Sequence, residues 1–268
     1  MGEEALREAA ERRAGFTRRV REGAPLAGTF LHFPSPELVE MAGLAGYDFV
    51  LLDGEHGAPG EAGLAELLRA GDAAGLPCVV RLPDGHPKRI LKALDLGAAG
   101  ILVPQVESAE EAAAVARAAR FPPAGERSLA PVVRASGYSA LDARAFVRAA
   151  EEAVSVWVQV ETRAGVEAAE AIAATPGVDL LFIGPVDLST ALGHPGEPDH
   201  PEVEAAIDAV TAAARRAGKP VGSFAVTPEQ AAFYRAKGVR LLASSLTVTL
   251  LRALREEAAW LQAALRTG

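Results

Sequence analysis

The sequence is poor in cysteine and in long apolar runs. Cys78 is the only cysteine among the 268 residues, which excludes an intrachain disulfide and a thiolate zinc cluster. No apolar run reaches the roughly 18 residues that a membrane helix needs. Residues 1–23 are charged throughout and have no apolar centre, which argues against a secretory signal. We therefore expect a cytoplasmic protein that does not act at a membrane.

Lysine is also scarce, and acidic residues outnumber basic ones. The net charge is −8, and only four residues are lysines, at positions 88, 92, 219 and 237. Nucleic acids are bound by clustered Lys and Arg side chains, so this balance argues against a nucleic acid partner. Half of the residues are apolar, which is enough for a large core. A chain of this length fits one α/β barrel, and we expect a single domain over residues 1–268.

Short apolar runs alternate with amphipathic segments along the chain. We expect strands within residues 26–33, 47–53, 77–83, 100–106, 156–162, 178–184, 219–226 and 239–245. Helical patterns lie between them, and several begin with a capping residue and end in Gly. Short apolar strands that alternate with helices are typical of parallel strands buried on both faces. Eight such units predict a (β/α)₈ TIM barrel.

The main alternative is a doubly wound open sheet, which should carry a Gly-rich turn after its first strand. The chain has "PSPE" there instead. The longest irregular stretch covers residues 121–140, and we expect this long loop after the fourth strand to shape the active site. Residues 256–266 have helical periodicity, and this helix either covers the barrel or packs on a neighbouring subunit.

Polar side chains gather where the expected strands end, and active sites of such barrels form at the C-terminal ends of the strands. These side chains follow four separate strands: Asp53, Glu55 and His56 the second, Arg81 the third, Gln159 and Glu161 the fifth, and Asp187 the sixth. One acid at the end of a strand is unremarkable. The repetition across strands predicts a catalytic site.

The residue types suggest roles. Glu161 and Asp187 end neighbouring strands and could share a hard cation such as Mg²⁺ or Mn²⁺. In the structural alternative, Glu161 pairs with Arg163 and Asp187 caps a helix. The guanidinium of Arg81 suits a carboxylate or an enolate oxygen. His56 is the best general base by its intrinsic pKa.

The other histidines carry weaker signals. We expect His32, His86, His194 and His200 to be ordinary surface residues. The stretch "HPGEPDH" offers His194, Asp199 and His200 as metal ligands, but its two prolines favour a simple connection between elements.

Several longer stretches together carry a family resemblance. They are "AGYDFVLLDGEHG", "VVRLP", "KALDLGAAGILVPQVESAEEA", "FPPAGERS", "VQVET", "GVDLLFIGPVDLS" and "HPEV", in this order. From about Ala27 to Leu251 the chain resembles the metal-dependent (class II) pyruvate aldolases of the HpcH/HpaI type. These include 4-hydroxy-2-oxoheptanedioate and 2-keto-3-deoxy-sugar-acid aldolases. The resemblance implies a (β/α)₈ barrel, assembled as a homohexamer that exchanges C-terminal helices.

The resemblance also implies a metal site. Glu161 and Asp187 would ligate a divalent metal, namely Mg²⁺, Mn²⁺ or Co²⁺, which pyruvate would chelate through its carboxylate and keto oxygens. Backbone N–H groups around Val186 and Asp187 would help to hold the carboxylate. Arg81 would stabilise the enolate oxygen, and Gln159 would lie beside the metal.

A catalytic dyad is implied as well, in which His56 pairs with Asp95 and acts through water. Read from the residues alone, Asp95 could simply end a helix before Gly97. Three positions depart from the family pattern: Ser128 replaces Gly, Gln105 replaces Met, and Phe224 replaces a pocket-lining aliphatic residue. The changes leave the metal ligands and the base intact. We expect them to affect which aldehyde the enzyme accepts.

The resulting functional hypothesis is an aldolase that reversibly cleaves 4-hydroxy-2-oxo acids to pyruvate and an aldehyde through a metal-stabilised pyruvate enolate. A Schiff-base aldolase would need a lysine at the end of a strand, which the sequence does not offer. An enolate-forming relative could instead act on oxaloacetate, by decarboxylation or by a citrate-synthase-like condensation. A non-catalytic scaffold should have lost these site residues.

Overall fold

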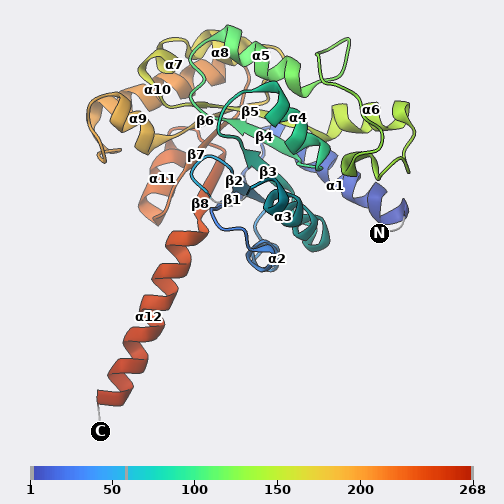
Figure 1. Ribbon diagram of the computed structural model, residues 1–268. Coiled ribbons are helices and arrows are strands. Elements are labelled where there is room, and N and C mark those ends of the chain that lie inside the picture. The colour runs from blue at the N-terminus through green and yellow to red at the C-terminus, as the bar shows by residue number, and fades with distance from the viewer. Residues whose placement is uncertain (1–2, 58–59, 267–268) are drawn as a thin grey trace.

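The computed structural model describes residues 3–57 and 60–266. Within these residues, parallel strands close into a barrel in chain order from β1 to β8, with β8 pairing back to β1. The strands are β1 (Leu26–Leu31), β2 (Phe49–Asp53), β3 (Cys78–Arg81), β4 (Gly100–Val103), β5 (Ser155–Val160), β6 (Leu180–Ile183), β7 (Val221–Phe224) and β8 (Leu241–Ser245). The predicted (β/α)₈ barrel is confirmed (Figure 1).

Helices connect the strands on the outside of the barrel (Figure 1). They are α2 (Pro36–Leu44), α3 (Glu61–Ala74), α4 (Pro87–Asp95), α5 (Ala109–Ala119), α6 (Ala143–Ala153), α7 (Arg163–Glu167), α8 (Ala169–Ala174), α9 (Pro185–Ala191), α10 (Pro201–Arg216) and α11 (Pro228–Ala236). Ser35, Ser108 and Thr227 cap α2, α5 and α11 by accepting backbone N–H bonds. These caps satisfy N–H groups that have no partner inside the helix.

Large aromatic side chains fill the inside of the barrel. Trp157 and Phe49 are fully buried there, with ring centroids 5.5 Å apart. A Cβ on Gly28 would overlap the Phe49 ring, so the small residue makes room for the large one. Helix α1 (Glu3–Arg21) adds Phe16, whose ring lies 5.7 Å from that of Phe49. Because α1 directly precedes β1, it covers the N-terminal end of the barrel and leaves the C-terminal end open.

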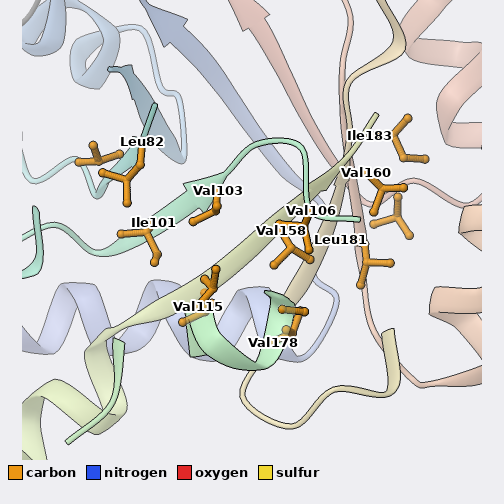
Figure 2. Packing of buried hydrophobic residues seen from close by; sticks show 14 of the residues in the cluster. Leu82, Ile101, Val103, Val106, Val115, Val158, Val160, Val178, Leu181 and Ile183 are labelled. Carbon is orange, nitrogen blue, oxygen red and sulfur yellow. The ribbon is translucent and has the colours of Figure 1, made fainter. Parts of the chain in front are cut away.

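A second apolar layer separates the strands from the surrounding helices (Figure 2). Val103 of β4 and Val158 of β5 belong to it, together with Val115 of α5. Every residue of β2, β3, β4, β5 and β6 is buried. This explains why these strands read as continuous apolar runs rather than as alternating patterns.

The irregular stretch at residues 121–140 lies at the end of the barrel away from the C-terminal ends of the strands. It connects α5 to α6, and α5 has already returned the chain to the N-terminal side. Arg134 from this stretch donates a 2.7 Å hydrogen bond to the carbonyl of Leu96, which precedes β4. The expectation that this loop shapes the active site is therefore wrong within one chain. The error came from treating it as a strand-to-helix loop.

Helix α12 (Leu246–Arg266) follows β8 and projects away from the barrel (Figure 1). None of its described residues is buried. The interpretation of residues 256–266 as a barrel-covering helix is therefore wrong. No helix within residues 3–57 and 60–266 is both long and apolar enough to cross a membrane.

Candidate active site

A cavity of about 230 Å³ opens at the C-terminal end of the barrel, where the sequence predicted the site. Six predicted residues line it: His56, Arg81, Gln159, Val186, Asp187 and Phe224. Arg81, Gln159 and Phe224 belong to β3, β5 and β7, whereas the others follow β2 and β6. Glu161 follows β5 and is only 2% exposed. No lysine lines this cavity among the described residues, which leaves a Schiff-base aldolase without its nucleophile there.

Two acidic side chains hold Arg81 in place. Asp53, the last residue of β2, accepts hydrogen bonds from Arg81 Nε at 2.9 Å and from Nη2 at 2.7 Å. Glu55 Oε2 lies 3.2 Å from Arg81 Nη1. The Arg81 guanidinium also lies over the Phe30 ring, 4.8 Å from its centroid. Asp53 and Glu55 therefore support Arg81, because a doubly hydrogen-bonded guanidinium has little freedom to turn.

Glu161 is buried beside the pocket. It accepts a 3.0 Å hydrogen bond from the Gln105 backbone N–H and a second from the Gln159 side chain. Gln105 has a φ of 53°, in the left-handed region that few residues other than Gly adopt. A Cβ on Gly184 would collide with the Glu161 carboxylate. The structural alternative is wrong for Glu161, because Arg163 pairs with Glu202 at 3.0 Å instead.

Asp187 lies in the first turn of α9 and lines the cavity. Gly184 occupies the N-cap position, so the helix-cap alternative for Asp187 is wrong too. Burial raises the pKa of Glu161 to about 7, and repulsion from Asp187 and Glu55 acts in the same direction. Carboxylates that repel one another beside a pocket are an arrangement that a divalent cation would relieve.

A buried oxygen supports the same conclusion. Among the described residues, Gln159 Oε1 has no hydrogen-bond donor, whereas Glu55 Oε2 has its ion-pair contact with Arg81. Buried acceptors without a donor are costly, unless a cation or water completes them. An all-oxygen set of this kind suits Mg²⁺ or Mn²⁺, which retain water and take substrate oxygens as further ligands. The residues present therefore fit a hard divalent metal.

The raised pKa of Glu161 predicts a pH-dependent stability in the presence of chelator. The folded state holds the Glu161 proton more tightly than the unfolded chain, whose carboxyl has a pKa near 4.5. The stabilisation that this proton gives the folded state is fully present below pH 4.5 and is lost as the pH rises to 7. The free energy of unfolding should therefore fall by about 3 kcal/mol over this range because of Glu161, and Glu161→Gln should remove that part of the fall. Urea unfolding of both proteins across this pH range measures it, and parallel pH curves would contradict the assignment.

His56 and Asp95 are not brought together within one chain. His56 is exposed at the pocket, and its Nε2 lies 3.8 Å from Glu55 Oε2. Asp95 ends α4, which returns the chain to the start of β4, and it pairs with Arg127 at 2.8 Å. The predicted dyad is therefore wrong for a single chain, because the two residues lie at opposite ends of the barrel.

Sequence reasoning missed His32. This residue follows β1 and lines the cavity, so its interpretation as an ordinary surface residue is wrong. Its Nε2 lies 3.2 Å from Asp53 Oδ2, and its Nδ1 lies 3.2 Å from the hydroxyl of Thr247. Burial lowers the pKa of His32. The signal was available, since His32 ends a strand on the same side as Asp53 and Arg81.

The fold and the pocket together define a class of protein. It is a (β/α)₈ barrel with an arginine held by two acids and with further carboxylates at the C-terminal ends of β5 and β6. The sequence profile of the HpcH/HpaI aldolase/citrate lyase family matches residues 26–253. The chain belongs to this family, and the predicted membership is confirmed.

Known proteins agree with this assignment. A hydroxypyruvate/pyruvate aldolase from Paraburkholderia phytofirmans is 40% identical over 245 residues, covering 89% of this chain and 94% of that protein. A family protein from Burkholderia cenocepacia J2315 superposes with a TM-score of 0.88 at 40% identity, covering 92% of this chain and 99% of that one. Citrate synthase SbnG superposes with a TM-score of 0.82 at 30% identity, covering 92% and 97%. These relatives support an enzyme of the HpcH/HpaI aldolase family.

Proposed function

We propose that this protein is a divalent-metal-dependent, class II aldolase that reversibly cleaves 4-hydroxy-2-oxo acids to pyruvate and an aldehyde. The observation that carries the proposal is that Asp187 and Arg81 line one pocket, while the buried Glu161 beside it interacts electrostatically with both. The hydroxypyruvate/pyruvate aldolase from Paraburkholderia phytofirmans, similar over nearly its whole length, supports the same reaction class. We also propose that the chain works as one barrel domain.

Glu161 and Asp187 would hold the metal, and Gln159 would lie beside it. The metal would supply Lewis-acid stabilisation of the negative charge that develops on pyruvate. Arg81 is oriented by Asp53 and Glu55, so its positive charge is in place before that charge develops. The backbone N–H groups of Val186 and Asp187 lie in the first turn of α9, where N–H groups have no partner inside the helix. They would bind the pyruvate carboxylate.

His56 would take the proton from the 4-hydroxyl group when the carbon–carbon bond breaks. Its ring is 59% exposed, so it can exchange that proton with water after each turnover. The pairing of His56 with Asp95, implied by the family resemblance, requires a second copy of the chain to supply Asp95. Phe224 forms one wall of the pocket and packs on Phe30 with ring centroids 5.8 Å apart. We propose that it contacts the substrate.

Pyruvate release from 4-hydroxy-2-oxo acids tests the proposed function. The protein is stripped with chelator and then given Mg²⁺, Mn²⁺ or Co²⁺ separately. We expect release to vanish with chelator and to return with metal. Release that persists unchanged after exhaustive chelation would contradict the metal-dependent reaction.

Oxaloacetate is the substrate of the second candidate function. The similarity to citrate synthase SbnG over nearly the whole of both chains favours oxaloacetate as a substrate, either for decarboxylation or for a citrate-synthase-like condensation. The pocket suits decarboxylation as well as aldol cleavage, because both reactions leave a pyruvate enolate that Arg81 and a metal held by Glu161 and Asp187 would stabilise. Consumption of oxaloacetate without cleavage of any 4-hydroxy-2-oxo acid would favour this second function.

We propose that the protein is a homo-oligomer, a hexamer by family resemblance, and that α12 mediates assembly. One face of α12 carries Leu250, Leu254, Leu261 and Leu265, each at least 40% exposed. An isolated helix with an exposed apolar face is marginally stable in water. A second copy of the chain would cover this face.

A charge placed on that face tests the assembly. Leu254→Glu should shift the mass in solution to a smaller species, because burying a carboxylate in an apolar contact is costly. Light scattering after gel filtration measures the mass. Arg252→Glu introduces the same side chain on the opposite face of α12 and should leave the mass unchanged. An unchanged mass in Leu254→Glu would contradict a role for this face.

A further inference from the structure

His32 connects the start of α12 to the acid that holds Arg81. Its Nε2 lies 3.2 Å from Asp53 Oδ2, and its Nδ1 lies 3.2 Å from the Thr247 hydroxyl, in the first turn of α12. We infer that His32 is a positioning residue, which keeps Asp53 and thereby Arg81 in place and ties both to α12. The inference rests on the proposed function, because Arg81 acts there as the charge that faces the enolate.

The closure of the barrel brings His32 and Thr247 together. In the pairing of β1 with β8, Phe30 lies opposite Ser245. His32 and Thr247 each follow two residues later, so they leave their strands side by side at the C-terminal end of the barrel. The contact therefore joins residues that are 215 positions apart in the sequence.

The two contacts define which ring nitrogen of His32 carries the proton. A carboxylate only accepts hydrogen bonds, so the nitrogen that faces Asp53 carries the hydrogen, and Nδ1 keeps its lone pair for the Thr247 hydroxyl. Burial lowers the pKa of His32, although the charge of Asp53 opposes this, and the ring is therefore neutral. With both nitrogens engaged, His32 has none left to take a proton from the substrate, and His56 keeps that role.

Asp53 is the residue through which His32 acts. Asp53 is fully buried, and its Oδ1 accepts the backbone N–H groups of Glu55 at 3.1 Å and of His56 at 3.2 Å. Its Oδ2 faces His32 and accepts from Arg81 Nη2. Rotation of this carboxylate would move the guanidinium of Arg81, and a displacement of about 1 Å at an active site can cost about 100-fold in rate.

The Phe30 ring lies against both His32 and Arg81. Its centroid is 6.2 Å from that of the His32 ring, with 28° between the two planes, and 4.8 Å from the guanidinium carbon of Arg81. Phe30 is only 3% exposed, so the packed interior of the barrel keeps its ring in place. This surface restricts the tilt of His32, while Asp53 and Thr247 restrict its rotation.

Steady-state kinetics of the assembled, metal-loaded protein test the inference. His32→Ala should lower kcat for pyruvate release about 10- to 100-fold. KM should change little, because Arg81 interacts more strongly with the enolate than with the bound ketone. His32→Gln keeps an N–H donor close to the position of Nε2 and should restore most of the loss. Thr247→Val removes only the hydroxyl and should lower kcat about 5-fold, the effect of one neutral hydrogen bond.

Oxalate binding gives a readout that needs no turnover. Oxalate is a planar dianion that resembles the enolate of pyruvate, whereas pyruvate itself presents a neutral keto oxygen. With Mg²⁺ present, His32→Ala should weaken oxalate binding by about the factor by which it lowers kcat, and pyruvate binding less. Titration calorimetry measures both affinities. The matched control is Thr249→Val, which makes the same change on the opposite side of α12 and should alter neither affinity.

Three results would overturn the inference. The first is an unchanged kcat and oxalate affinity in His32→Ala, and the second is an unchanged kcat in Thr247→Val. The third is an equal loss in His32→Gln and His32→Ala, which would make the ring itself a proton acceptor. Melting temperatures of all variants separate these effects from a loss of folding.

Failure of the proposed function would look different, because the parent protein would then neither release pyruvate nor bind oxalate. Crystal structures of the metal-free parent and of His32→Ala would still decide the inference. In the variant we expect the Asp53 carboxylate to rotate and Arg81 to lose one of its two hydrogen bonds to it. An unchanged arrangement of Asp53 and Arg81 would overturn the inference whatever the reaction of the enzyme.

Discussion

Glu161→Ala and Asp187→Ala are each expected to lower metal-dependent pyruvate release by about 1000-fold or more, because each removes one of the two proposed metal ligands. Turnover at saturating Mg²⁺ or Mn²⁺ measures the loss. The two residues follow neighbouring strands, and Glu161 is 2% exposed, so surrounding side chains cannot easily replace its carboxylate. Full activity in either variant would contradict the metal assignment.

Folding must be separated from metal binding in this experiment. Glu161→Ala leaves the Gln105 N–H and the Gln159 side chain without their shared acceptor, which costs stability by itself. Glu161→Gln keeps the shape and an acceptor oxygen, and it should lose as much activity as the Ala variant while melting closer to the parent. Asp84→Asn is the control. Asp84 is an acid that follows a strand too, in this case β3, but it is exposed and pairs with Arg89 at 2.9 Å.

His56→Ala is expected to slow aldol cleavage by about 100- to 10 000-fold, the usual contribution of a general base. It should spare the decarboxylation of oxaloacetate, which requires no deprotonation of a 4-hydroxyl group. Both rates are measured on one preparation with the same metal. His86→Ala changes a histidine outside the pocket and should alter neither rate. An equal loss of both reactions in His56→Ala would remove this residue from the role of base.

The partner of His56 can be tested in the assembled protein. If Asp95 of a second copy completes the pair, neither His56→Ala nor Asp95→Asn should cleave the substrate well alone. Mixed oligomers formed by co-expression would contain some sites with both intact residues, and activity should partly return. No recovery in verified mixed oligomers would indicate that Asp95 acts only through its ion pair with Arg127.

The fold was predictable because the apolar pattern of each strand and helix can be recognised within its own short segment of sequence. Runs such as Phe49–Asp53 are apolar at every position, and a strand must be covered on both faces to bury all of them. The helical pattern expected between the third and fourth strands is observed as α4 (Pro87–Asp95). Strand ends were predicted as sites of function because parallel strands in a barrel all present their C-terminal ends to one side. That rule correctly brought Arg81, Gln159 and Asp187 to one pocket.

The errors arose where a role depends on what lies nearby in space. Asp95 was paired with His56 by resemblance, and within one chain α4 carries it to the other end of the barrel, so that this pairing stays a prediction for two copies of the chain. The stretch at residues 121–140 was counted as a loop at the active-site end, although it follows a helix rather than a strand. His32 was taken for a surface residue although it follows a strand, and its contact with Asp53, the partner of Arg81, became evident only in the structure.

The sequence by itself determined the barrel, through the periodicity of its apolar runs, and the residue types available at the strand ends, because both are properties of the local chain. The family followed from the resemblance of several stretches. Only the tertiary structure decided which charges meet. It assigned Arg81 to Asp53 and Glu55, left Glu161 facing other carboxylates, and placed His32 between Asp53 and Thr247. Electrostatic interactions depend on distance through space and on burial, and neither is encoded in the spacing of residues along the chain.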